Sequence, residues 1–174
     1  MLLGGARSGK SALAARWGHA HDGPVTFVAT GQAGDDEMAE RISRHRAERP
    51  ASWTTVEAPT GLVGTVVGAP DDALVIVDCL TLWVANVLSE LGDDEVLARA
   101  GALGAAAAAR PAPTIVVSNE VGTGIVPADP TTRRYRDLLG GVNATVVNHA
   151  AAAWLLVAGR ALPLHPPPAG PTAA

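Results

Sequence analysis

A glycine-rich segment close to the N-terminus reads Gly4-Gly5-Ala6-Arg7-Ser8-Gly9-Lys10-Ser11. It matches the pattern G-x-x-x-x-G-K-[ST] at every fixed position. Glycines in such a loop let successive backbone N–H groups turn inward toward phosphate oxygens. The Lys10 ammonium can lie between the β- and γ-phosphates of a nucleoside triphosphate, and the Ser11 hydroxyl is a ligand that Mg²⁺ accepts. The segment therefore predicts a loop that binds nucleotide phosphates.

The residues on either side of the loop agree with this interpretation. Met1-Leu2-Leu3 is typical of the end of a buried strand, although it is short for one, and residues 11–17 are typical of a helix. A helix that begins here turns the positive end of its dipole toward a bound anion. Lysine and arginine together number 13, yet Lys10 is the only lysine. An accidental glycine-rich turn is the alternative, and a lone lysine at this position weighs against it.

Length and composition limit the class of protein. The 174 residues suffice for one domain with a substantial core, which we expect to span residues 1–165, followed by a disordered Pro/Ala-rich tail at 166–174. The net charge of −4 and the absence of a basic stripe argue against nucleic acid as a partner. Cys79 is the only cysteine, and we find neither a signal peptide nor an apolar run long enough to span a membrane. These features predict a cytoplasmic protein.

Apolar runs alternate with helical patterns along the chain. We expect strands at residues 24–30, 53–57, 73–78 and 113–118, and a closing strand pair at 154–159 and 161–164. Helices are expected at residues 35–49, 60–67, 81–91, 93–110 and 130–149. This alternation predicts an α/β layered fold with a mostly parallel central sheet and a C-terminal strand pair. With the phosphate-binding loop, it indicates a RecA-like P-loop NTPase fold.

Two further segments can contribute to a nucleotide site. The apolar run that ends in Asp78 resembles a buried strand that delivers a carboxylate to the Mg²⁺ of a phosphate-loop protein, so Ser11 and Asp78 are the candidate metal ligands. The polar, glycine-rich loop at residues 119–127 follows another buried strand. Because such loops lie on the ligand side of parallel sheets, this loop should face the site.

The helix expected at residues 35–49 carries a candidate functional histidine. Met38, Ile42, His45 and Arg49 share one face by their spacing, so His45 should point inward among apolar neighbours with Arg49 one turn beyond. Position alone favours a half-buried structural histidine with a backbone partner over a catalytic one.

Four stretches together resemble a known family. They are the phosphate-binding loop, Asp35-Asp36-Glu37-Met38 with Arg41-Ile42 and His45-Arg46, Val77-Asp78-Cys79-Leu80-Thr81-Leu82-Trp83, and Ser118-Asn119-Glu120-Val121-Gly122-x-Gly124-Ile125-Val126-Pro127. This set is similar to the bifunctional adenosylcobinamide kinase/adenosylcobinamide-phosphate guanylyltransferase family of cobalamin biosynthesis, and the resemblance covers nearly the whole chain. The loop at residues 119–127 is its most specific part, since ordinary nucleotide kinases lack it.

The resemblance implies two reactions at one nucleotide site. ATP or GTP phosphorylates the hydroxyl of adenosylcobinamide, and GTP then transfers GMP to that phosphate through a GMP–histidine intermediate, which gives adenosylcobinamide-GDP and pyrophosphate. The family's histidine falls on His45, which reverses the bland interpretation of that residue, and Lys10 serves the phosphates. The implied GTP contacts are Gly4 to Ser11, Thr30, Gly31, Gln32, Ala47, Glu48, Arg49, Pro50, Glu57 and Asp78. The family also forms a homotrimer.

Two other functions remain open on the sequence. A single-activity phosphate-loop kinase would have a structural His45 and an arginine-rich lid, for which Arg133, Arg134 and Arg136 are the candidates. A nucleotide-binding switch without catalysis would lack the catalytic groups, but Lys10, Ser11 and Asp78 are all present.

Overall fold

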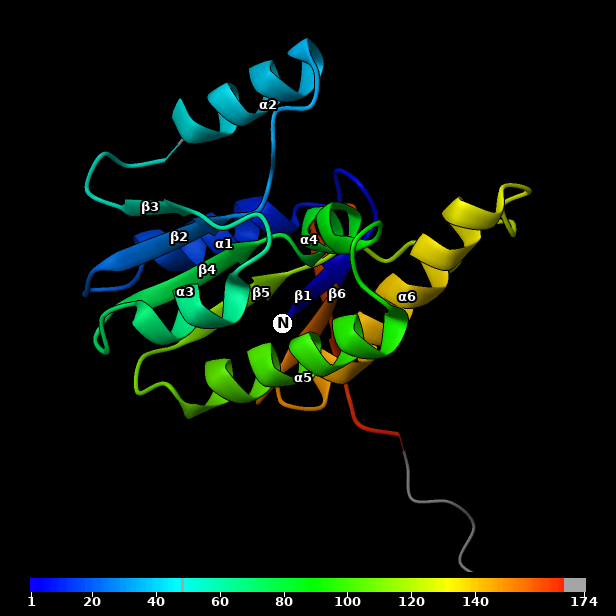
Figure 1. Cartoon of the computed structure of the whole chain (residues 1–174). Helices are drawn as coiled ribbons and strands as arrows, with labels where there is room; N and C mark the ends of the chain where they lie inside the picture. The colour runs from blue at the N-terminus through cyan, green and yellow to red at the C-terminus, as the bar shows by residue number, and fades with distance from the viewer. Residues whose placement is uncertain (48, 168–174) are drawn as a thin grey trace, which may run out of the picture.

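Seven strands and six helices alternate along the computed structural model, which describes residues 1–47 and 49–167 (Figure 1). The strands are β1 (Leu2–Gly4), β2 (Val25–Ala29), β3 (Thr54–Glu57), β4 (Leu74–Asp78), β5 (Thr114–Val117), β6 (Ala153–Val157) and β7 (Arg160–Leu164). The helices are α1 (Lys10–His19), α2 (Asp36–Ala47), α3 (Leu62–Gly68), α4 (Leu80–Val87), α5 (Asp93–Ala109) and α6 (Pro130–Val147). Every expected strand and helix is present.

All seven strands form one sheet in the order β3-β2-β4-β5-β1-β6-β7. Every pairing is parallel except that of β6 with β7, so the mostly parallel sheet and the closing strand pair are confirmed. The register aligns Glu57 with Ala29, Ala29 with Asp78 and Asp78 with Val117. The carboxyl ends of four strands therefore meet in one row at the edge that carries the phosphate-binding loop.

Side-chain alternation along the strands divides the core into two layers. Val75 and Val77 of β4 belong to a buried cluster with residues of α3, α4, α5 and α6. Leu74 and Ile76 belong to a second cluster with Leu13 of α1 on the opposite face. Because both faces of the sheet are covered, its central strands are apolar throughout. Helix α2 belongs to neither layer and stands off the body beyond the sheet (Figure 1).

Helices α2, α4 and α6 end at least two residues earlier than their sequence patterns predict, α6 at Val147 rather than at residue 149. Helix α2 ends at Ala47 rather than Arg49, because the proline at position 50 disfavours helical geometry in the residue before it. Helix α4 ends at Val87 rather than Leu91. Arg134 of α6 donates hydrogen bonds to the carbonyls of Leu88 (2.9 Å) and Leu91 (2.9 Å), which stabilises a turn in place of a further helical turn.

No helix within the described ranges combines the length and the apolar character that a membrane span requires. Most of the tail expected at residues 166–174 lies outside the described residues, as does Glu48.

Candidate active site at the carboxyl edge of the sheet

The phosphate-binding loop joins β1 to α1 in a conformation that requires glycine. Gly4 has a φ of 148° and Gly9 a φ of 100°, and a Cβ on Gly4 would lie 2.3 Å from the carbonyl oxygen of Leu156. The Lys10 side chain is buried and donates hydrogen bonds from Nζ to the Gly5 carbonyl (2.7 Å) and to Ser8 Oγ (3.3 Å). The loop thus curls around its own lysine and holds the ammonium at the N-terminus of α1.

Two other segments brace this loop from outside. The Gly159 N–H, in the turn between β6 and β7, donates to the Ser8 carbonyl (2.9 Å). The Glu120 N–H, just beyond β5, donates to the Gly4 carbonyl (3.0 Å). The carbonyls of Gly4 and Ser8 are therefore held by the segments that follow β5 and β6, the two strands that neighbour β1.

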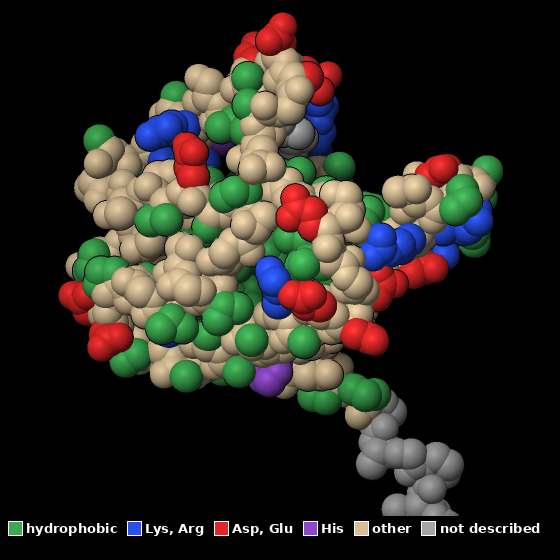
Figure 2. Space-filling view, in the orientation of Figure 1, with side chains coloured by type: hydrophobic (Ala, Val, Ile, Leu, Met, Phe, Trp, Pro, Cys, Tyr) green, Lys and Arg blue, Asp and Glu red, His purple; other side chains and the backbone are tan. Residues whose placement is uncertain are grey.

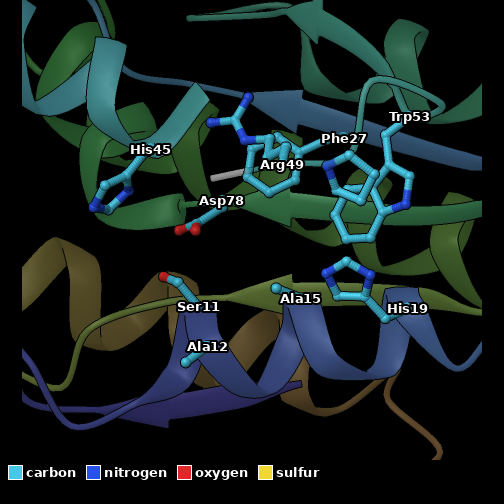
Figure 3. Close-up of a pocket in the computed structure, with 10 residues that line it drawn as sticks. Ser11, Ala12, Ala15, His19, Phe27, His45, Arg49, Trp53 and Asp78 are labelled. Atoms are coloured by element: carbon cyan, nitrogen blue, oxygen red, sulfur yellow. The ribbon is translucent and has the colours of Figure 1, made fainter. Parts of the chain in front are cut away.

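A pocket of about 250 Å³ opens beside the start of α1 (Figure 3). Helix α1 forms its floor, the ends of β2 and β4 form its back wall, and α2 with the segment after it lies above (Figure 3). Its lining residues are Ser11, Ala12, Ala15, His19, Phe27, His45, Arg49, Pro50, Trp53 and Asp78. Of the sequence-predicted site residues, Ser11, His45, Arg49, Pro50 and Asp78 come together here.

One end of the pocket is ionic and centred on Asp78. Burial raises the pKa of this carboxyl group, whereas a hydrogen bond from Ser11 and the positive charges of His45, Arg49 and Lys10 oppose the rise. Burial also lowers the pKa of Lys10, and the negative charges of Asp78 and Cys79 act against it. These cations favour the ionised form of Asp78 beside the Ser11 hydroxyl.

His45 points from α2 toward Asp78 across this ionic end (Figure 3). Ile42 and His45 are half-buried, which confirms the inward orientation of that part of the predicted face. Arg49 is half-buried too, but it lies beyond the end of α2, and the side chain of Met38 lies outside what the structure describes. The expected neighbourhood of apolar residues and Arg49 is incomplete, because His45 also shares the pocket with Ser11 and Asp78. The spacing on a helix predicts which face turns inward, but it says nothing about which strand end that face meets.

The other end of the pocket is aromatic. Phe27 and Trp53 stack with ring centroids 6.5 Å apart and an interplanar angle of 18°, and His19 lies 5.3 Å from Trp53. The Arg49 guanidinium carbon lies 3.6 Å above the Phe27 ring centroid, a cation–π contact. No local pattern in the sequence predicts this cluster of rings, because they lie on β2, α1 and the segment before β3, and only the fold brings them together.

The remaining predicted nucleotide contacts lie around the pocket rather than in its wall. The Thr30 hydroxyl is already engaged, since it accepts from the Cys79 N–H (2.8 Å) and donates to the Cys79 carbonyl (2.7 Å). Glu57 is exposed, and its carboxylate lies 3.6 Å from Arg46.

The other predicted contacts differ in exposure: Gly31 is half-buried, whereas Gln32 and Ala47 are exposed. As nucleotide contacts, these residues stay predictions.

The arginines of α6 do not form a lid over the phosphate-binding loop. Arg133 donates to the carbonyls of Pro127 (2.9 Å) and Ala128 (2.6 Å). Arg134 binds Asp93 (2.7 Å), and Arg136 binds its neighbour Asp137 (2.9 Å). Arg133 and Arg136 are thus engaged next to α6, and Arg134 ties α6 to the start of α5, which removes the feature that favoured a single-activity kinase.

The described residues contain no group of three or more His, Cys, Asp and Glu side chains gathered for a metal. The donor set at Asp78 nevertheless suits Mg²⁺, which takes few protein oxygens and completes its shell with phosphates and water. The Ser11 hydroxyl and the Asp78 carboxylate, hydrogen-bonded to each other, are such a pair.

Comparison with known proteins identifies the family. Residues 1–164 match the CobU family, described as cobinamide kinase / cobinamide phosphate guanyltransferase. The chain belongs to this family. It is 41% identical over 165 residues to the bifunctional adenosylcobalamin biosynthesis protein CobP of Pseudomonas aeruginosa, which covers 94% of this chain and 95% of that protein. It is 40% identical over 179 residues to CobU of Salmonella typhimurium, named as the same bifunctional protein, with 91% and 95% covered.

Solved structures support the fold at much lower identity. An ATPase of a bacterial type III secretion system aligns with a TM-score of 0.55 at 14% identity, over 90% of this chain and 50% of that one. The assembled ATPase EscN of an enteropathogenic Escherichia coli aligns with a TM-score of 0.56 at 13% identity, over 90% and 43%. These likenesses support the P-loop NTPase fold and carry no argument about the reaction.

Proposed function

We propose that this protein phosphorylates adenosylcobinamide with ATP or GTP and then transfers GMP from GTP to adenosylcobinamide phosphate. Family membership supports the two activities. The observation that carries the shared site is the position of His45, which faces Ser11 and Asp78 across a pocket next to the phosphate-binding loop. A single nucleotide bound there would present its phosphates to both Lys10 and His45.

In the kinase step the chain mainly binds and orients the donor. The loop N–H groups and Lys10 hold the β- and γ-phosphates, and the positive end of α1 faces the same charge. Ser11 and Asp78 are the residues that would hold Mg²⁺, which when bound neutralises phosphate charge. No protein nucleophile is required, because the substrate hydroxyl attacks the γ-phosphorus directly.

In the guanylyl-transfer step His45 acts as the nucleophile. A ring nitrogen attacks the α-phosphorus of GTP, the bond to the β-phosphate oxygen breaks, and pyrophosphate leaves with the electron pair. Lys10 stabilises the departing pyrophosphate, and Arg49 lies in the same pocket as His45, where it can offset charge on the α-phosphate. A phosphate oxygen of adenosylcobinamide phosphate then attacks the phosphorus and releases His45.

Substitution of His45 by alanine tests this proposal. With α-labelled GTP, the His45→Ala protein should take no covalent label, and its guanylyl transfer should fall by at least about 10³-fold because the nucleophile is gone. Phosphorylation of adenosylcobinamide by γ-labelled ATP should persist. On the wild-type protein the label should be acid-labile and base-stable, as a phosphoramidate is.

The control is His165→Ala, which removes an exposed histidine outside the pocket and should label like the wild type. Full labelling of His45→Ala would move the nucleophile to another residue. Kinase activity without any wild-type label would favour the single-activity kinase with a structural His45.

We further propose that residues 1–165 form one catalytic domain, that the protein is cytoplasmic and that it is a homotrimer. Support for the trimer comes from the loop before α6, which projects from the body with hydrophobic side chains at its tip (Figure 2). Ile125 is 97% exposed and Val126 is 59% exposed. Exposed apolar side chains gathered on a projection are typical of a subunit contact.

A further inference from the structure

The kinase step needs a group that the site described so far does not supply. When a hydroxyl attacks the γ-phosphorus, its proton must leave, and enzymes of this kind orient the hydroxyl with a carboxylate. Lys10 is a donor of hydrogen bonds, and Asp78 is paired with Ser11 as a metal ligand. The acceptor of that proton has to come from elsewhere on the carboxyl edge of the sheet.

The strand order indicates that this proton acceptor lies in the segment after β5. Strand β5 lies between β1, which leads into the phosphate-binding loop, and β4, which ends at Asp78. The chain that leaves β5 is therefore flanked by both halves of the phosphate site. Two hydrogen bonds hold it against β1 and the loop: Ser118 N–H donates to the Leu2 carbonyl (2.9 Å), and Glu120 N–H donates to the Gly4 carbonyl (3.0 Å). Glu120 is thus anchored to the first residue of the phosphate-binding loop.

The backbone just before Glu120 is held on its other side as well. The Asn119 N–H donates to Thr81 Oγ1 of α4 (2.8 Å), and Asn143 Nδ2 of α6 donates to the Asn119 carbonyl (2.9 Å). Thr81 and Asn143 are both buried. Helices α4 and α6 therefore fix the position from which the Glu120 side chain extends, which is a requirement for a group that must meet a substrate atom.

Glu120 is half-buried as a residue, and its carboxylate is partly engaged in a hydrogen bond that is open to solvent. Its Oε1 accepts a hydrogen bond from the Gly122 N–H (2.6 Å), which orients the group. Among the residues that the structure describes, Oε2 has no hydrogen-bond donor, and no cation pairs with the carboxylate. Oε1 is held by the Gly122 N–H of the loop at residues 119–127, while Oε2 remains able to accept a proton.

The other carboxylates at this edge follow strands that are further from β1 and the phosphate-binding loop. Glu57 ends β3, which is separated from β1 by three strands, and it pairs with Arg46. The acidic residues at the start of α2 follow β2 and are separated from β1 by β4 and β5. Glu120 alone among the described carboxylates follows a strand adjacent to β1 and also touches the loop backbone.

We propose that Glu120 is the general base of the kinase step. Its carboxylate accepts the proton of the substrate hydroxyl as the new O–P bond forms and the bond from the γ-phosphorus to the β–γ bridging oxygen breaks. The electron pair leaves with the nucleoside diphosphate, and the proton passes from Glu120 to solvent. This assignment rests on the proposed kinase activity, and it deepens it by naming the residue that activates the acceptor.

The second reaction provides an internal control. In guanylyl transfer the acceptor is a phosphate, which is already ionised and has no proton to lose. The same protein, nucleotide and phosphate-binding loop are used, but Glu120 has no role. Loss of the carboxylate should therefore separate the two activities in the opposite sense to loss of His45.

The test uses Glu120→Gln in the full chain, because the amide oxygen still accepts from Gly122 but cannot take a proton. With adenosylcobinamide and γ-labelled ATP, kcat should fall by about 10²-fold or more. With ready-made adenosylcobinamide phosphate and GTP, guanylyl transfer should stay within about twofold of the wild type. Glu90→Gln, which removes an exposed carboxylate after α4, should leave both rates unchanged.

A second variant moves the carboxylate without removing it. A Cβ on Gly122 would lie 2.9 Å from Glu120 Oε1, so Gly122→Ala must displace this flexible side chain and should give an intermediate loss of kinase activity alone. Kinase activity of Glu120→Gln near the wild-type value would overturn the assignment. So would an equal loss of both activities, which would indicate that Glu120 only supports the loop. A wild-type protein that transfers GMP but shows no kinase activity would refute the kinase half of the proposed function as well.

Discussion

Asp78 combines two demands that oppose each other, since a metal ligand must be ionised whereas burial favours the protonated form. Burial raises the pKa of Asp78 above its ordinary value in spite of the hydrogen bond from Ser11 and the nearby cations. As pH falls, Asp78 should therefore become protonated at a higher pH than an exposed aspartate does. The Mg²⁺ concentration for half-maximal activity should rise over that range.

Asp78→Asn should raise the Mg²⁺ requirement at neutral pH by about 10- to 100-fold and should remove its rise in acid. The measurement is a Mg²⁺ titration of His45 labelling by GTP over a series of pH values, with Asp72→Asn, an exposed aspartate near the opposite edge, as the control. Superimposable titrations for the wild type and Asp78→Asn would exclude Asp78 from the metal shell.

Individual residues were predictable where a motif fixes the chemistry. Lys10 and Ser11 lie where the phosphate-loop pattern predicts, because such a loop tolerates few residue types. Asp78 lies at the end of a buried strand, as the apolar run before it predicts. His45 was identified through resemblance, since its position on a helix favoured a structural role. Glu120 lay in a segment that we expected to face the site, but its contact with Gly4 depends on β5 lying beside β1, which no local pattern encodes.

At the scale of elements, the strands and helices followed their apolar periodicity, whereas helix ends were set by a tertiary contact in one case and by a local proline in another. Helix α4 stops at Val87 because Arg134, some forty residues further along the chain, takes the carbonyls that a further turn would use. The end of α2 was set locally by Pro50, and Arg49 reaches the pocket from beyond the helix. Periodicity alone could anticipate neither boundary.

The turn between β6 and β7 is an element whose conformation should matter for nucleotide binding. Gly159 has a φ of 74°, and its N–H holds the Ser8 carbonyl of the phosphate-binding loop. No atom within 4 Å would meet a Cβ there, so Gly159→Ala adds backbone strain rather than a clash. We expect a loss of about 1 kcal/mol in the free energy of unfolding and a higher KM for the nucleotide in both reactions.

Urea unfolding and KM for ATP and GTP measure these effects. Ala158→Gly should change stability in the opposite direction, because Ala158 already has a φ of 50°. Gly64→Ala, on the exposed face of α3 where a Cβ meets nothing, serves as the control. If Gly159→Ala matches the wild type in both stability and KM, the turn does not brace the loop.

For the whole molecule, the alternation of strands and helices predicted a layered parallel sheet, but the order of its strands became known only from the structure. That order places β5 between β1 and β4 and α2 outside both layers. It results from long-range packing of apolar faces, for which many arrangements share the same local signals. The exposed tip before α6 is likewise visible only in three dimensions (Figure 2).

If the protein is a trimer through this tip, Ile125→Asp should weaken assembly. A charge at the centre of an interface costs at least about 2 kcal/mol, so the dissociation constant should rise by about 30-fold or more. Light scattering after size-exclusion chromatography over a dilution series gives the mass. Val67→Asp, an equally polar change at a 65% exposed site on α3, is the control. Identical masses for Ile125→Asp and the wild type at every dilution would place the contact elsewhere.

The isolation of Lys10 gives this chain a built-in chemical reporter. Because the only side-chain amine lies in the phosphate-binding loop, an amine-reactive acyl phosphate of ATP or GTP can acylate a lysine nowhere else. The lowered pKa of Lys10 increases the neutral fraction that reacts. An acylated lysine resists trypsin, so the peptide that ends at Lys10 is replaced by one that continues to Arg16. Mass spectrometry of that one junction would report how fully the nucleotide site is occupied, even in an unpurified mixture.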